Sequence, residues 1–118
     1  MDATALALPV RRGNRLYVDL ASDPQDIRAA QALRYEVFGA EMGAKLKAGE
    51  PGLDVDELDP FCQHLLVRES VTGRVVGCTR ILTDENAHRI GRFYSEGEFD
   101  LAAIRALPGR MLEVGRTC

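Results

Sequence analysis

Apolar residues recur at every second position in several short segments of this chain, and at every third or fourth position in one longer segment. A period of two is typical of strands, and a period near 3.6 is typical of amphipathic helices. Residues 15–21 have the first pattern, with Tyr17 and Asp19 alternating with three aliphatic residues. These residues are therefore predicted to form a strand.

A helix is predicted to follow directly. Ser22-Asp23 offers an N-cap candidate, and Pro24 suits the first turn of a helix. The helical pattern continues to about Phe38. Its expected inner face consists of Ile27, Ala30, Leu33, Val37 and, at the far end, Met42.

The middle of the chain predicts a β-hairpin. Residues 64–69 and 74–82 are apolar strands, and Ser70-Val-Thr-Gly73 between them is a turn signal. Residues 84–91 are expected to form a turn or a short helix. Ser95-Glu96-Gly97-Glu98 has the spacing of a capping box before a short helix over residues 99–107, which Pro108-Gly109 ends.

These elements come in the order strand, helix, hairpin, short helix and strand. The order predicts the α/β (α+β) fold class, with a mainly antiparallel sheet flanked by helices and residues 75–82 as a central strand. Residues 1–14 are expected to be a flexible leader, and residues 15–118 the folded part. Residues 44–59 are predicted to be a loop long enough to carry a function.

The last nine residues carry an unusual signal. Met111, Leu112 and Val114 form a short apolar strand with Glu113 and Arg116, and no turn or helix follows. Strands normally end in turn residues such as Gly, Pro, Asn or Asp. We therefore expect the chain to be truncated, with apolar side chains and an unpaired strand edge exposed at this point.

Composition narrows the class of protein. A length of 118 residues with 46% hydrophobic and 28% charged residues is typical of one small globular domain. The net charge of -3 provides no basic surface for nucleic acid. No apolar run approaches the ~20 residues of a transmembrane helix, and no signal-peptide pattern is present, so the cytoplasm is the expected compartment. Three cysteines without a C-x-x-C pair disfavour a disulfide framework and a zinc site.

Charged residues on apolar strands are the first candidates for chemistry. Arg80 lies within the strand at residues 74–82, and Glu113 and Arg116 lie on the final strand. A charge in such a position needs a partner if it is buried. Arg80–Glu113 is the natural ion pair. A purely structural pairing and a substrate-binding network are both consistent with this pattern.

Three further groups have competing interpretations. Arg34 and Phe38 share one helix face, and taken alone they indicate a solvated Arg above a core Phe. The acidic residues 54–59 lack the Gly and the oxygen ligand of an EF-hand, so they indicate either a solvated loop or an Asp56–Asp59 pair that holds a cationic amine. Cys62 and His64 could form a nucleophile and its base, but a structural Cys and a hydrogen-bonded His are favoured.

Several motifs lie in order along residues 16–118. They are Arg34-Tyr35-x-x-Phe38, Asp56-x-x-Asp59, His64-Leu-Leu-Val67, Val75-Val-Gly-Cys-Thr-Arg80-Ile-Leu82, Phe93-Tyr-Ser-Glu96-x-Glu98-Phe99 and Leu112-Glu-Val-Gly-Arg116-Thr-Cys118. Together they resemble the N-terminal half of the ornithine-lipid N-acyltransferases, which are also called hemolysin-like proteins. This family belongs to the GNAT superfamily and is similar to the acyl-homoserine lactone synthases.

The resemblance implies a GNAT-like fold and the transfer of a long-chain acyl group from acyl carrier protein to the α-amine of ornithine. It implies catalytic roles for Glu113 and Arg116. It implies substrate-binding roles for Arg34, Phe38, Asp56, Asp59 and Arg80. Acyl carrier protein or acyl-CoA would be the donor, with no tightly bound cofactor and no metal. Contact with the inner membrane and a homodimer through the exposed strand edge stay open.

The residues suit this chemistry. A carboxylate such as Glu113 can accept the proton that an ammonium group must lose before it attacks a thioester. Arginine can hold a carboxylate through two hydrogen bonds. Direct transfer needs only that amine and thioester be fixed side by side. The alternatives are an acetyl-CoA-dependent acetyltransferase or autoinducer-type synthase, and a non-catalytic half-domain that binds a small amine or dimerises.

Overall fold

The β2–β3 hairpin forms the middle of the sheet. The computed structural model describes residues 15–41 and 52–118, and its sheet has the order β1-β2-β3-β4 with every neighbouring pair antiparallel. The strands are β1 (Leu16–Leu20), β2 (Gln63–Glu69), β3 (Val75–Leu82) and β4 (Glu113–Gly115). The predicted antiparallel sheet is confirmed, and β3 is an interior strand as expected.

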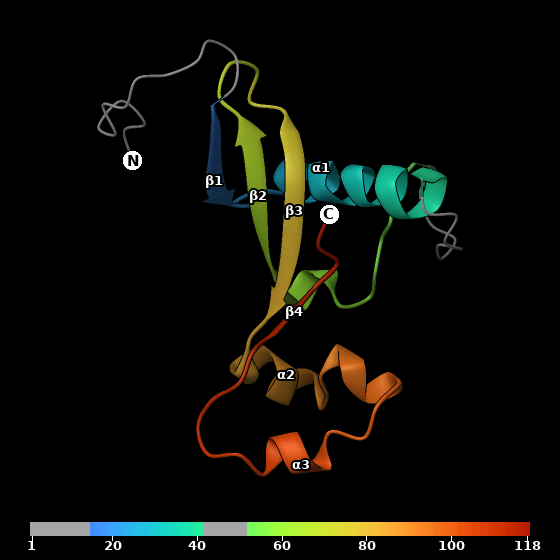
Figure 1. Ribbon diagram of the computed structural model, residues 1–118, viewed down its shortest axis with the longest axis vertical. Coiled ribbons are helices and arrows are strands. Elements are labelled where there is room, and N and C mark those ends of the chain that lie inside the picture. The colour runs from blue at the N-terminus through green and yellow to red at the C-terminus, as the bar shows by residue number, and fades with distance from the viewer. Residues whose placement is uncertain (1–14, 42–51) are drawn as a thin grey trace.

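Helix α1 (Pro24–Arg34) crosses one face of the sheet (Figure 1). It begins as predicted, because the Asp23 side chain accepts a hydrogen bond from the Asp26 N–H at 2.9 Å and Pro24 occupies the first turn. The α-helical geometry ends four residues before Phe38, at Arg34, and the chain continues as the π-helix η2 (Tyr35–Glu41). Met42, which was expected on the inner face, lies outside the described residues.

Two apolar clusters hold the elements together. Under α1, Ala30 packs against Leu66 of β2 and Cys78 of β3. Beyond the end of the sheet, Leu82 packs with Ala87 of α2 (Asp84–Ile90) and with Phe93. In Figure 1, α2 lies below the end of β3, and α3 (Ala102–Arg105) lies beyond it.

The segment after α2 differs from its prediction. A 3-10 helix, η4 (Tyr94–Gly97), and the four-residue α3 replace the helix expected over residues 99–107. The predicted capping box is wrong, because the Ser95 hydroxyl and N–H both donate to Glu113 on β4. An ionised carboxylate is a stronger acceptor than the neutral alternatives within the segment, so the tertiary contact replaces the local one.

Among the described residues, several apolar side chains on the sheet face opposite α1 are exposed. Leu16, Val18 and Leu20 on β1 are between 50% and 58% exposed, and Leu112 and Val114 are similarly exposed. In β1, it is the less apolar Tyr17 and Asp19 that turn toward the side of α1, where Asp19 pairs with Arg68. No helix among the described residues is long and apolar enough to cross a membrane.

Replacement of Leu66 by Ala tests the core. Leu66 is 0% exposed, so Leu66→Ala should lower the free energy of unfolding by about 2–5 kcal/mol in a urea titration followed by circular dichroism. Leu107→Ala removes the same atoms from a side chain that is 60% exposed, and should change stability by less than about 0.5 kcal/mol. Equal losses in the two variants would contradict the placement of the core.

Candidate functional site

Arg34 is the centre of a buried ionic network. Its side chain is 1% exposed at the end of α1, and its Nε atom donates to Asp54 at 3.0 Å. Its two terminal nitrogens donate to the carboxylate of Asp59 at 3.0 and 2.8 Å. The interpretation of Arg34 as a solvated residue is therefore wrong. The acidic segment docks against the last turn of α1, where the Asp54 N–H also donates to the Gln31 carbonyl.

Asp59 accepts hydrogen bonds from four residues of this network. It begins the short 3-10 helix η3 (Asp59–Phe61), and its carboxylate accepts hydrogen bonds from Gln31, Arg34, Arg80 and the Asp56 N–H. Burial alone would raise the pKa of the Asp59 carboxyl. The hydrogen bonds from Arg34 and Gln31 outweigh burial and hold this pKa well below its ordinary value. Asp59 is therefore ionised at neutral pH.

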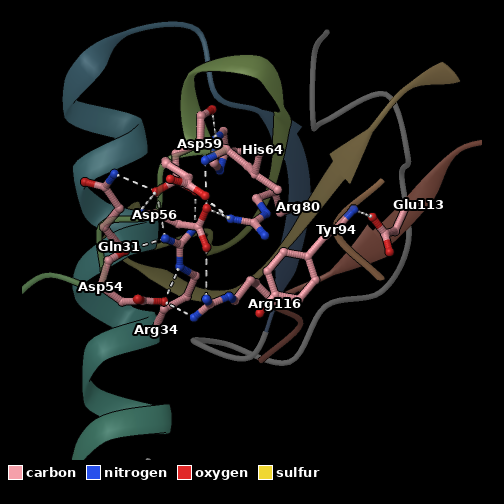
Figure 2. Close-up of polar contacts among 12 residues, drawn as sticks. Gln31, Arg34, Asp54, Asp56, Asp59, His64, Arg80, Tyr94, Glu113 and Arg116 are labelled. Carbon is pink, nitrogen blue, oxygen red and sulfur yellow. Dashed lines mark hydrogen bonds and ion pairs between the residues drawn. The ribbon is translucent and has the colours of Figure 1, made fainter. Parts of the chain in front are cut away.

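Two further arginines reach the same acids from the sheet (Figure 2). Arg80 of β3 contacts Asp59 at 3.1 Å and Asp56 at 3.3 Å through its Nη1 atom. Arg116, which follows β4, contacts Asp54 at 2.7 Å and Asp56 at 3.0 Å. The predicted Arg80–Glu113 pair is wrong, because the acidic loop supplies the partners of Arg80. A solvated acidic loop is excluded as well, since all three aspartates are buried.

The charges of the network balance. Three guanidinium groups face three carboxylates, and each carboxylate contacts two arginines. Burial would raise the pKa of Asp56, but the Leu58 N–H and the charges of Arg80 and Arg116 lower it overall. Buried charges are tolerated when they are paired in this way. A cationic amine that reached Asp56 or Asp59 would have to compete with an arginine already bound there.

A β-bulge directs Arg116 into the network. Gly115 pairs with Arg80, while the Cys118 and Cys78 backbones exchange hydrogen bonds of 2.8 and 3.0 Å. Two residues, Arg116 and Thr117, therefore lie opposite Thr79 alone, and Arg116 has a left-handed φ of 50°. Regular alternation would put Arg116 on the opposite face from Glu113. The extra residue brings the Arg116 side chain to the face that carries Arg80.

Glu113 lies outside the ionic network. Its carboxylate accepts hydrogen bonds from the Tyr94 N–H at 2.7 Å, from the Ser95 N–H at 2.9 Å and from the Ser95 hydroxyl. It therefore caps the start of η4 from a neighbouring strand. The Tyr94 ring lies over both guanidinium groups, with its centroid 5.6 Å from Arg80 and 6.0 Å from Arg116. In Figure 2, Tyr94 lies between Glu113 and the two arginines.

A cavity of about 630 Å³ opens beside these groups. Its lining includes four of the predicted site residues, namely Phe38, Arg80, Glu113 and Arg116. The other three do not line the cavity. Asp56 and Asp59 lie behind its wall as partners of the arginines that face the cavity, and Arg34 binds Asp59 from the far side. The structure thus brings the seven predicted residues to one region, in two layers. Their roles in binding and catalysis stay predictions.

Three residues of the site were not among the predicted ones. Asp54 bridges Arg34 and Arg116, Gln31 donates to Asp59 at 3.0 Å, and Tyr94 covers two arginines. Gln31 lies one turn before Arg34, so the helical period offered a signal for it. Asp54 is part of the acidic segment that the sequence singles out. Nothing in the local pattern around Tyr94 indicated the cation–π contacts.

Cys62 and His64 have structural surroundings. The His64 Nε2 atom lies 3.0 Å from the Asp59 carbonyl oxygen, and the side chain is buried. Burial raises the pKa of the Cys62 thiol to about 11. A thiol with so high a pKa is almost fully protonated at neutral pH and is a poor nucleophile. These observations confirm the favoured interpretation over a Cys–His catalytic pair.

This chain is similar to known acyltransferases. The family model described as acetyltransferase (GNAT) domain matches residues 33–118. An L-ornithine N(alpha)-acyltransferase of Rhodobacter capsulatus is 43% identical over 86% of this chain and 42% of its own length. Its counterpart in Brucella abortus is 36% identical over 95% of this chain and 43% of its own length. This chain thus spans less than half of these relatives.

A solved structure supports the fold. The AHL synthase LasI matches with a TM-score of 0.62 over 89% of this chain and 53% of its own chain. The two sequences are 20% identical, so the likeness concerns the fold alone.

The network predicts acid sensitivity. The pKa of Asp59 and that of Asp56 are lowered in the folded protein, so their stabilising effect is complete above the ordinary Asp pKa of about 3.9 and is lost as pH falls below it. At pH 7, Asp59→Asn should cost about 3–5 kcal/mol in urea titrations, because it leaves arginines partly unpaired. Between pH 5 and pH 2, the free energy of unfolding of the Asp59→Asn variant should fall by less than that of the unmodified chain.

Asp56→Asn provides a second test if Asp59→Asn does not fold at pH 7. Glu98→Gln makes the same change from carboxylate to amide at an exposed position and is the control. Equal pH dependence in all variants would contradict the assignment of acid sensitivity to the network.

Proposed function

Since this chain belongs to the GNAT acetyltransferase family, we propose that it forms the acceptor site of an N-acyltransferase. The reaction moves a long-chain acyl group from acyl carrier protein to the α-amine of ornithine. The observation that carries the proposal is the convergence of Phe38, Arg80, Glu113 and Arg116 on one cavity, in a chain whose relatives are named L-ornithine N(alpha)-acyltransferase.

The cavity suits a small amino acid. Its volume of about 630 Å³ is within the range of small-molecule sites. Arg80 and Arg116 supply guanidinium groups that can bind the α-carboxylate of the acceptor. Phe38 and Tyr94 provide apolar walls. The buried aspartates hold both arginines in place, so in this proposal they act on the acceptor through the arginines.

The transfer itself is direct. The neutral amine of ornithine attacks the thioester carbon, and the bond between carbon and sulfur breaks. The proton that the nitrogen loses passes to the sulfur, so the carrier leaves as a thiol. Glu113 in the cavity wall either relays this proton, directly or through water, or organises the groups around the reacting atoms. No covalent acyl-enzyme is needed, which agrees with the raised pKa of Cys62.

The proposed partners follow from this reaction. Acyl carrier protein delivers the acyl chain, and ornithine enters from the cytoplasm. The product carries one long acyl chain, so it partitions into the inner membrane, where peripheral contact of the enzyme would aid its release. These assignments rest on the proposed reaction.

A donor and acceptor screen tests the function. The full-length protein should convert ornithine and long-chain acyl carrier protein to N-acylornithine, identified by mass spectrometry. Acetyl-CoA should be a poor donor and S-adenosylmethionine a poor acceptor. A lactone product from S-adenosylmethionine would instead indicate an autoinducer-type synthase, and the absence of transfer with every pair would favour a binding half-domain.

Replacement of Glu113 tests the site. Glu113→Gln should leave the fold intact in circular dichroism but lower kcat/KM for ornithine by about tenfold, because hydrogen bonds to a charged group are lost. Glu98→Gln, at an exposed position away from the cavity lining, should retain activity. Unchanged turnover of Glu113→Gln would rule out Glu113 as a base or as an organiser of the site.

A further inference from the structure

Glu113 of β4 fixes the position of the Tyr94 backbone. The N–H groups of Tyr94 and Ser95 open the 3-10 helix η4, and the N-cap residue Phe93 provides no side-chain cap for them. Both donate to Glu113, one to each carboxylate oxygen, at 2.7 and 2.9 Å. The Ser95 hydroxyl is a third donor to the same carboxylate. Glu113 therefore holds the backbone that carries the Tyr94 ring.

The ring in turn contacts two cations. Its centroid lies 5.6 Å from the Arg80 guanidinium carbon and 6.0 Å from that of Arg116, both within the range of cation–π attraction. The two arginines share the Asp56 carboxylate on their other side. Each guanidinium is thus held between an acid behind it and an aromatic ring beside the cavity.

These contacts explain why Glu113 and Arg116 lie three residues apart. Glu113 holds the backbone of Tyr94, and the Tyr94 ring covers Arg116, which follows Glu113 by three residues. The bulge at Arg116 and Thr117 is what brings both ends of this arrangement to one face of the sheet. Two sets of contacts therefore join η4 to the β4 segment, one through Glu113 and one through Arg116.

We propose that Tyr94 is a positioning residue that fixes the Arg80 and Arg116 guanidinium groups along the cavity, and that Glu113 acts on the site by holding Tyr94. The inference rests on the proposed function in one respect, because it takes the ornithine carboxylate as the ligand of these arginines. Three of the roughly four acceptor directions of the Glu113 carboxylate are already used, which favours a holding role over proton transfer.

Kinetics of three variants in the full-length protein test the proposal. Tyr94→Leu should raise KM for ornithine by about tenfold with little change in kcat, since the loss concerns binding. Tyr94→Phe should restore the wild-type KM, because the ring face makes the contacts. Tyr35→Leu is the matched control, since Tyr35 has the same 41% exposure and is not part of the cavity lining. A Phe variant as impaired as the Leu variant would overturn the role of the ring.

A double-variant cycle tests the link to Glu113. If Glu113 acts through Tyr94, the Tyr94→Leu/Glu113→Gln protein should be no less active than Tyr94→Leu alone. Losses that multiply would show that Glu113 has an independent role, as a base would, and would overturn that part of the proposal.

A measurement without turnover separates this proposal from the proposed function. The Nε–H groups of Arg80 and Arg116, assigned by nitrogen-15 NMR, should show lower heteronuclear NOE values in Tyr94→Leu and unchanged values in Tyr94→Phe, because only the Leu variant lacks the ring that restrains them. Increased mobility in the Leu variant of a protein that does not acylate ornithine would uphold the positioning and refute the reaction. Unchanged mobility in the Leu variant of an active enzyme would refute the positioning alone.

Discussion

The buried contact between arginines and aspartates is the constraint on which the rest of this structure depends. Arg34, at the end of α1, is 1% exposed and binds two carboxylates of the acidic segment. An unpaired guanidinium in that position would be very costly, so helix and loop must come together. The same carboxylates bind Arg80 and Arg116 from the sheet. One network thus joins helix, loop and sheet where the cavity opens.

This network fixes the side chains that line the cavity. Arg80 is held from behind by Asp56 and Asp59, and its guanidinium carbon lies near the Tyr94 ring. Such a wall presents positive groups whose directions are set before any ligand arrives. Preorganised donors of this kind bind a carboxylate without paying for its alignment at the moment of binding. This is the physical link between a buried ion network and the proposed selection of an amino acid.

Likeness to known proteins and geometry contribute different parts of the conclusion. The family match and the fold likeness to LasI establish the class of domain. The geometry shows which side chains of that domain face the cavity and which stabilise them. It also separates Glu113, which caps η4, from the ionic network that the sequence had suggested as its place. The acyl-transfer proposal draws on both, since this chain spans less than half of its relatives.

The sequence by itself determined the elements whose signals are local. The N-cap at Asp23, the hairpin and the apolar strand around Arg80 could be predicted, because capping, turn chemistry and side-chain alternation act over a few residues. The motif resemblance also identified the residues that gather at the cavity. Arg34 was expected in solvent when taken alone, because its acidic partners lie 20 and 25 residues away in the chain.

Only the tertiary structure decided the pairing of these groups. Glu113 was matched with Arg80 because both lie on adjacent apolar strands, yet its carboxylate bonds to Tyr94 and Ser95, 19 and 18 residues away. The bulge that turns Arg116 toward the acids has no local signature, since a non-glycine residue in the left-handed region is stable only within its surroundings. Electrostatic contacts between residues far apart in the chain determine the partners. The alternation of side chains along a strand gives no information about these contacts.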